Sequence, residues 1–280
     1  MIETKDLTKI FDNFTAVDSL NLKIEKGEFF GLLGPNGAGK TTTISLLSTL
    51  LLPTKGEILI DGQQLTRQRP DLKRKISVIT QEYSMRQDMN MDEIMEYQGR
   101  LYFMPGKQIK ERTEELLEFC DLLKFRKRTV RKLSGGMKRK LMVCRALLTD
   151  PEILLLDEPT AGMDALSRRQ MWNLLRKLND KNLTILLTTH YMEEAQSLCN
   201  RVALMDHGKL EEVSTPSALI ESLGAYAVDE MTADGTQNHY FHTRQEAIRY
   251  LEELTGQASL RETTLEDVFV ERAGKHLISK

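Results

Sequence analysis

The sequence predicts an α/β fold built on a mixed, mostly parallel central sheet, because two patterns alternate along the chain. Short and continuous apolar runs are typical of strands that are covered on both faces, and they lie at residues 28–33, 76–80, 153–157 and 183–189. Helical stretches at 41–52 and 167–178 lie between these runs. Alternation of strands and helices is the pattern of α/β proteins.

Length and composition restrict the classes of protein to which this chain can belong. At 280 residues it suits one main domain, residues 1–220, and an appendage, residues 221–280. A net charge of −2 gives no overall basic field for nucleic acid, and the three distant cysteines argue against a disulfide framework or a zinc site. No apolar run approaches the roughly 18 residues that cross a bilayer. We therefore expect a cytoplasmic protein that reaches a membrane only through a partner.

The first strands are expected to form an antiparallel edge subdomain. Leu20, Leu22 and Ile24 alternate with polar residues, which is the pattern of a strand buried on one face only. Such a subdomain beside parallel strands makes the predicted sheet arrangement mixed.

Residues 86–149 interrupt the alternation and are predicted to form an all-helical insert. Ile109 and Leu116 belong to a run with helical spacing, and Pro105–Gly106 interrupts the helical pattern. The methionine-rich stretch 86–95 is either an adaptable apolar surface or the core of a helix, and the pattern leaves both interpretations open.

Residues 221–280 are predicted to form a small α+β extension. A helix that begins before residue 221 ends at Gly224. Two strands joined by a polar turn follow, and then a helix that ends at Gly256. Thr263 and Glu266 have the spacing of a capping box at the start of a last helix.

A glycine-rich loop follows the first buried strand and opens a helix. Its sequence GPNGAGKTT matches the G-x-x-x-x-G-K-[ST] motif, and its residues are Gly34, Pro35, Asn36, Gly37, Ala38, Gly39, Lys40, Thr41 and Thr42. The backbone N–H groups and the helix N-terminus form an anion site there. Lys40 would reach the β- and γ-phosphates of a nucleotide, and the Thr41 hydroxyl would ligate Mg²⁺. The sequence therefore predicts a P-loop NTPase.

Two carboxylates and a histidine follow two other buried strands. Asp157 and Glu158 end the run ILLLDE, and His190 directly follows LTILLTT. Because ligands bind at the carboxyl ends of strands in open α/β sheets, we expect these side chains at one edge. Asp157 would hold Mg²⁺, and Glu158 would polarise a water against the γ-phosphate. His190 would contact the γ-phosphate or hold that water.

A second glycine-rich turn, LSGGM, opens another helix further along the chain. Ser134 is a natural N-cap, and Gly135 and Gly136 expose the backbone, so the turn is a second anion site. The P-loop of one chain already surrounds its nucleotide. The second site therefore has no use within a single copy of the chain.

The ordered series GPNGAGKTT, Gln81, LSGGM, ILLLDEP, AGMD and His190 resembles the ATP-binding-cassette (ABC) ATPase family over about residues 1–215. The resemblance implies that Phe11 stacks on the adenine of ATP, with Phe14 as the alternative. It also implies that Gln81, in the loop that joins the sheet to the helical insert, contacts Mg²⁺ or the attacking water and reports the nucleotide state to a membrane partner.

The same resemblance implies a head-to-tail pair of cassettes around ATP. Ser134, Gly135 and Gly136 of each copy would close over the γ-phosphate that the other copy holds, and Asp164 of AGMD would lie at the contact between the copies. All the motifs of the ATP site are present in this one chain, which favours a homodimer and leaves a heterodimer open.

Two positions depart from the family pattern. Met137 stands where the family usually has glutamine after the two glycines, and Thr80 stands where the Gln loop usually has proline. Neither change removes a γ-phosphate donor or the catalytic carboxylate, so we expect an active ATPase. A non-hydrolysing regulatory cassette conflicts with the presence of Lys40 and Glu158.

The resemblance implies the nucleotide-binding subunit of a membrane transporter. The helical insert and the Gln loop would receive a separately encoded transmembrane permease, which holds the chain on the inner face of the cell membrane. LSGGMKRKL, AGMDALSRRQMW and TLEDVF resemble the exporter branch that includes drug-, antibiotic- and polysaccharide-efflux ATPases. The partner in that branch is usually a six-helix permease of the ABC-2 type.

Two alternatives stay open beside export. An importer ATPase would use the same motifs. A soluble ABC ATPase that acts on nucleic acid or ribosomes usually has two cassettes, long coiled coils or zinc modules, and this sequence has one cassette, no sustained heptads and no four-cysteine pattern. We therefore expect no nucleic-acid partner.

Overall fold

The computed structural model describes residues 1–82, 85–232, 235–254 and 256–278. The chain falls into two compact units, Met1–His190 with Ala203–Glu212 and Tyr191–Val202 with Val213–Lys280. The predicted division at residues 220 and 221 stays a prediction. Within the described residues, no helix combines the length and the apolar character that a membrane span requires.

Among the described residues the central sheet has six strands, and its middle strands β3, β8 and β7 are parallel and completely buried. Its order is β10 (Lys209–Ser214), β9 (Arg201–Asp206), β3 (Phe29–Leu33), β8 (Thr184–Thr189), β7 (Ile153–Asp157) and β6 (Ile76–Ile79). Thr189 pairs with Leu33, and Thr188 pairs with Asp157. The register therefore brings the carboxyl ends of β3, β7 and β8 to one edge of the sheet, as predicted.

A separate antiparallel sheet confirms the predicted edge subdomain. Its order is β2 (Phe14–Ile24), β1 (Ile2–Phe11), β4 (Lys55–Ile60) and β5 (Gln63–Gln64). β1 and β2 form a hairpin in which Phe11 and Phe14 are partners at the closed end. The mixed α/β architecture is thus confirmed.

The helices of the first unit are α1 (Lys40–Leu47), α2 (Pro70–Arg74) and α6 (Ala165–Asn179), together with those of the helical segment described below. α1 is shorter than the predicted helix over 41–52. Thr49 has φ of 60°, a left-handed conformation that ends a right-handed helix, and Leu50 and Leu52 are exposed beyond it.

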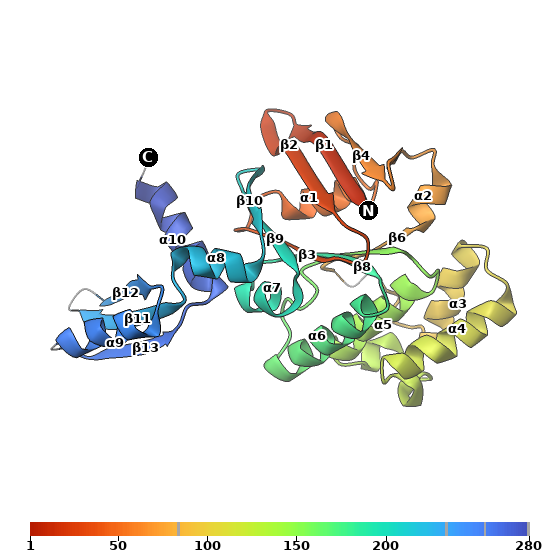
Figure 1. The fold of residues 1–280 in the computed structure, drawn as a ribbon. Helices are drawn as coiled ribbons and strands as arrows, with labels where there is room; N and C mark the ends of the chain where they lie inside the picture. The colour runs from red at the N-terminus through yellow and green to blue at the C-terminus, as the bar shows by residue number, and fades with distance from the viewer. Residues whose placement is uncertain (83–84, 233–234, 255, 279–280) are drawn as a thin grey trace. The chain divides into compact units, whose positions relative to one another are not determined.

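The region between β6 and β7 is helical. It contains α3 (Met91–Leu101), α4 (Gly106–Phe119), the short 3₁₀ turns Leu123–Phe125 and Val130–Lys132, and α5 (Gly135–Leu147) (Figure 1). Met91 and Met95 are 0% exposed, so in this part of the methionine-rich stretch the core interpretation is correct. Exposed large apolar side chains lie on α3 at Tyr97 and Leu101 and just beyond its end at Tyr102 and Phe103.

The second unit contains a three-stranded antiparallel sheet and four helices among its described residues. The sheet order is β12 (Gly235–Phe241), β11 (Tyr226–Thr232) and β13 (Ala258–Glu262), and the helices are α7 (Met192–Leu198), α8 (Pro216–Leu223), α9 (Arg244–Glu253) and α10 (Leu265–Ile278). The predicted polar turn includes residues 233–234, which lie outside the described residues. α8 ends at Gly224 as predicted, whereas α9 ends at Glu253, before the predicted Gly256.

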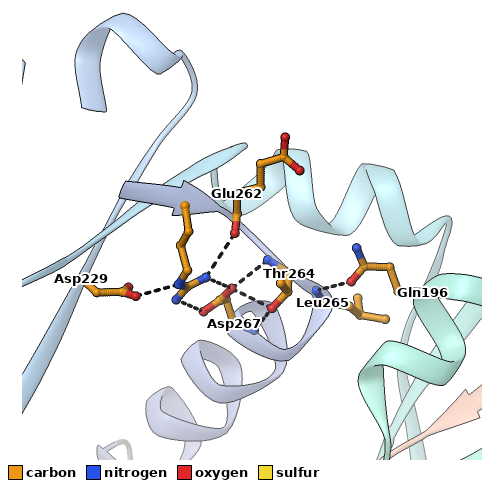
Figure 2. A network of polar contacts seen from close by, with 7 residues as sticks. Gln196, Asp229, Glu262, Thr264, Leu265 and Asp267 are labelled. Carbon is orange, nitrogen blue, oxygen red and sulfur yellow. Dashed lines mark hydrogen bonds and ion pairs between the residues drawn. The ribbon is translucent and has the colours of Figure 1, made fainter. Parts of the chain in front are cut away.

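The start of α10 corrects the predicted capping box by one residue. The Thr264 N–H donates to Asp267 Oδ2 over 2.7 Å, and the Asp267 N–H donates to Thr264 Oγ1 over 3.4 Å. Arg261 donates to both oxygens of Asp267 and to Asp229 of β11, each over 2.7 Å (Figure 2). This network holds Asp267 inward, so Thr264 and Asp267 form the box and the predicted Glu266 is exposed.

Candidate functional site

The loop Gly34–Gly39 between β3 and α1 fits closely against neighbouring backbone. Gly39 has φ of 102°, and a Cβ there would lie 2.3 Å from the carbonyl oxygen of Ala16. A Cβ at Gly34 would lie 2.1 Å from the carbonyl oxygen of Met205. Both positions therefore require glycine, for conformation in one case and for close approach in both.

Lys40 folds back over this loop. Its side chain is 5% exposed, and its ammonium donates to the carbonyl oxygens of Gly34 over 2.8 Å and Pro35 over 3.0 Å. Burial lowers the pKa of Lys40, while the charges of Glu158 and Asp157 act in the opposite direction without overcoming burial. The cation thus belongs to the same electrostatic site as both carboxylates.

Asp157 joins three elements at the carboxyl edge of the sheet. It is 4% exposed, and its Oδ1 accepts hydrogen bonds from Thr188 Oγ1 over 2.6 Å and Thr41 Oγ1 over 3.1 Å. The first donor is on β8 and the second is on α1. The register of the parallel strands thus brings the acid of β7 to the predicted edge of the sheet, where it lies beside the P-loop hydroxyl.

Glu158 occupies a strained position just after β7. Its φ is 47°, and its N–H donates to the Thr188 carbonyl over 3.1 Å. A left-handed backbone costs a non-glycine residue roughly 1–2 kcal/mol, so the surrounding contacts must hold it. The Nδ1 of His190 lies 3.1 Å from Glu158 Oε1. A hydrogen bond from His190 to a carboxylate oxygen in this contact requires the proton on Nδ1, because a carboxylate oxygen accepts.

Lys40, Glu158 and His190 line a pocket of about 540 Å³, whereas Asp157 lies behind Thr41 and does not line it. Its lining residues are Phe14, Ala16, Asn36, Gly37, Gly39, Lys40, Thr41, Thr42, Gln81, Glu158, Ala161 and His190. Gly34, Pro35 and Ala38 belong to the loop that forms the wall without being lining residues. The structure therefore brings Gln81, Glu158 and His190 together with the P-loop.

The aromatic residue of the pocket is Phe14, whereas the sequence pointed first to Phe11. Phe11 does not line the pocket, and the Lys9 ammonium lies 4.9 Å from the centre of its ring. Phe14 is 62% exposed and lines the pocket beside Ala16. The hairpin pairs the two residues across its strands, and of the two it is Phe14 on β2 that lines the cavity.

The LSGGM turn and Asp164 form a separate group. Ser134 caps α5 by accepting from the Met137 N–H over 3.3 Å, and Asp164 caps α6 by accepting from the Ser167 N–H over 2.8 Å. A Cβ at Gly136 would lie 3.2 Å from Ser167 Oγ, so the two caps are neighbours. The pocket at the P-loop is not lined by any of the four described residues Ser134, Gly135, Gly136 and Asp164.

Sequence reasoning missed two residues that organise this region, Thr188 and Arg139. Thr188 bonds both Asp157 and the backbone of Glu158. Arg139 is 3% exposed although it stands in the lysine-rich run KRK. Its helical spacing from Met142 and Ala146, which are buried apolar residues, was the available indication that it faces inward.

Comparison with known proteins identifies the family of this chain. The profile of the ABC transporter family matches residues 17–161. The chain is 35% identical to "Nod factor export ATP-binding protein I" of Cupriavidus metallidurans, covering 99% of this chain and 98% of that protein. It is 40% identical to the daunorubicin/doxorubicin resistance ATP-binding protein DrrA of Streptomyces peucetius, covering 80% of this chain and 68% of that protein.

A solved structure extends the similarity to three dimensions. The ATP-binding cassette MJ0796, in a dimeric post-hydrolysis state bound to ADP and Pi, superposes with a TM-score of 0.68 and 28% identity, covering 77% of this chain and 98% of that one. The P-loop, the adjoining carboxylates and the LSGGM turn thus occur on a cassette fold. The chain therefore belongs to the ABC transporter family, as an ATP-binding and ATP-hydrolysing subunit.

Proposed function

We propose that this subunit drives export through a separately encoded transmembrane permease and works on the inner face of the cell membrane. Support comes from relatives whose names refer to Nod factor export and to daunorubicin/doxorubicin resistance. ABC ATPase subunits of transporters work with permeases and form dimers, and the finer proposal is a six-helix ABC-2 permease. The exposed apolar side chains of Tyr97, Leu101 and Phe103 are a candidate surface for it.

The oxygen atoms at the P-loop fit Mg²⁺ as ligands. This ion binds hard oxygen ligands, which one or two protein groups and the phosphates of the nucleotide supply. The Thr41 hydroxyl and the buried Asp157 carboxylate are oxygen donors 3.1 Å apart. Thr41 would ligate the ion, Asp157 would hold it, and Gln81 would contact the ion or the attacking water. Bound there, Mg²⁺ would neutralise charge on the phosphates of ATP.

Glu158 is proposed as the general base for hydrolysis. Its carboxylate lines the pocket, is 13% exposed and contacts the His190 ring. His190 would orient this carboxylate and contact the γ-phosphate or the attacking water. Lys40 and the loop amides would bind the phosphates, and Phe14 is proposed in place of Phe11 as the ring that stacks on adenine.

We further propose that two copies pair head to tail, so that Ser134, Gly135 and Gly136 of one act on the ATP of the other. The single observation that carries this proposal is the separation of the LSGGM turn from the pocket of its own chain. The turn lies instead beside Ser167, which bonds Asp164. An anion site and an acid next to each other suit a contact between copies.

A mixing experiment tests the pairing. Lys40→Ala disables the P-loop, and Ser134→Asp keeps a good N-cap while it places a negative charge where the γ-phosphate would bind. Each variant alone should lose ATPase activity. In a head-to-tail pair, a mixed dimer contains one site with both intact halves, so an equal mixture should recover roughly a quarter of the wild-type rate.

The controls separate pairing from folding. Ser134→Asn keeps the cap without the charge and should retain most activity. No recovery from the mixture, with both variants folded, would contradict the pairing. Reconstitution with the permease in vesicles then tests direction: transport into inside-out vesicles on addition of ATP supports export, and transport out of them would support an importer.

A further inference from the structure

One buried side chain connects the helix after LSGGM with the two segments that carry Gln81 and Glu158. Arg139 lies on α5 and is 3% exposed. Its guanidinium donates to main-chain carbonyl oxygens on both of the other segments. These are Thr80 over 2.8 Å, Gln81 over 3.2 Å, Glu158 over 2.6 Å and Pro159 over 2.7 Å.

The bonds to Glu158 and Pro159 act on a strained backbone. Glu158 has φ of 47°, and its N–H is held from one side by Thr188. Arg139 holds the carbonyl of the same residue from the other side. The planar guanidinium donates two hydrogen bonds to the consecutive carbonyls of Glu158 and Pro159, and this fixes the orientation of the backbone at these two residues. The direction in which the Glu158 side chain leaves the backbone is thereby set.

The bonds to Thr80 and Gln81 act on the Gln loop. Nη1 donates to both carbonyls, and Gln81 lines the pocket that contains Glu158. The guanidinium of Arg139, on the helix that follows LSGGM, therefore connects the Gln loop to the residues that directly follow β7. A displacement of α5 acts on both segments together, because the guanidinium is planar and its donors keep fixed mutual positions.

We propose that Arg139 is a positioning residue that sets the geometry of Glu158 relative to Gln81 and couples both to α5. This rests on the roles proposed above for Glu158 and Gln81. Arg139 acts through the backbone of these residues and is not assigned a contact with ATP. Movement of the helical segment, when a permease or a second copy binds, would reach the general base through this side chain.

Two substitutions of Arg139 test the proposal. Arg139→Lys keeps the positive charge but has no planar fork, and Arg139→Gln removes both. We expect both to lower kcat roughly 10- to 100-fold, as misplacement of a catalytic group does, and to leave the KM for ATP within about threefold. The matched control is Arg112→Gln, which removes a guanidinium from α4 that pairs with Glu115 and Asp150 at the surface. It should leave kcat unchanged.

A double-mutant cycle with Glu158→Gln distinguishes positioning from general stabilisation. If Arg139 acts through the Glu158 carboxylate, Arg139→Gln should lower the single-turnover rate much less in the Glu158→Gln background than in the wild type. An equal fold loss in both backgrounds would overturn the proposal. A wild-type kcat in Arg139→Lys would also overturn the proposal. If Arg139→Gln fails to fold, the kcat of Arg139→Lys decides between the two outcomes. A Glu158→Gln variant with normal activity would instead refute the proposed base.

Discussion

Arg139 in the unit that holds the P-loop and Arg261 in the other unit each join three segments of chain, but they bind different kinds of oxygen. Arg139 donates to four main-chain carbonyls. Arg261 of β13 donates to the carboxylates of Asp229 and Asp267, and also to the Glu262 carbonyl (Figure 2). The first arrangement fixes backbone, and the second fixes the start of a helix by ion pairs.

The difference has a physical consequence. Main-chain carbonyls do not titrate, so the contacts of Arg139 with them keep the same strength over the pH range in which carboxylates change charge. The contacts of Arg261 with Asp267 depend on the charge of that carboxylate. We therefore expect the first network to control catalytic geometry and the second to control local stability in an acid-sensitive way. Variants in the two units should then affect different measurements.

The largest effect is expected for Glu158→Gln. Loss of the general base should lower kcat about 10²- to 10⁴-fold. Hydrogen exchange of the peptide covering residues 258–272 should not change, because its network lies in the other unit. Steady-state ATPase assays and exchange mass spectrometry measure the two quantities. Glu266→Gln, at an exposed position of α10, is the control. Activity equal to that of the wild type would contradict the assignment of Glu158.

Arg261→Gln should show the opposite profile. It leaves Asp267, whose side chain is 9% exposed, without its bidentate partner, and this should lower the local opening free energy of α10 by roughly 2–3 kcal/mol. Exchange protection at the start of α10 measures the loss. Basal kcat should stay within about twofold of the wild-type value. A large loss of kcat with unchanged exchange protection would contradict the expectation that the Arg261 network controls local stability and not catalysis.

Acid should weaken the Arg261 network before it affects the Arg139 network. Burial by itself would raise the pKa of Asp267, but hydrogen bonds from Arg261 and Thr264 outweigh it, so the pKa lies below its usual value. A carboxyl with a lowered folded pKa stabilises fully above the unfolded value of about 3.9 and loses this stabilisation as pH falls through the folded value. Exchange protection of α10, corrected for intrinsic rates, should fall below about pH 4 in the wild type and much less in Arg261→Gln. Equal acid sensitivity in both proteins would contradict this.

The sequence predicted the elements whose pattern is local. β3, β7 and β8 were recognisable as continuous apolar runs. The P-loop was recognisable by its glycines, which permit a left-handed backbone at Gly39 and close approach to neighbouring backbone. The same pattern also predicted that Asp157, Glu158 and His190 lie at one edge of the sheet, since parallel strands end at the same edge.

The parts that escaped prediction depend on contacts between distant segments. Arg139 stands among lysines, and apart from its helical spacing from Met142 and Ala146 its burial becomes evident only from the packing of α5. Phe11 and Phe14 are equivalent as hairpin aromatics until the fold determines which ring reaches the pocket. Thr263 and Thr264 each have an acid three residues later, and Arg261 selects the second pair.

Phe14→Ala should weaken ATP binding more than Phe11→Ala. Stacking of a base on an aromatic side chain contributes about 1–3 kcal/mol, and the exposure of Phe14 suggests the lower end. We expect a roughly five- to tenfold rise in the dissociation constant for ATP with Phe14→Ala and less than a twofold rise with Phe11→Ala. Titration with a fluorescent ATP analogue measures both. The reverse order would restore Phe11 as the adenine contact.

The smallest effects concern two adjacent threonines at the start of α10, and they test how finely the Arg261 network determines local structure. Thr264→Ala removes the cap oxygen and should destabilise α10 by about 1 kcal/mol. The Thr263 hydroxyl is buried and finds no hydrogen-bond partner among the described residues. Thr263→Val replaces it with a methyl group of similar shape and should be neutral or stabilising. Exchange protection of α10 measures both variants. If Thr263→Val were the more damaging one, the predicted box with Glu266 would be the correct one, and Asp267 would serve Arg261 alone.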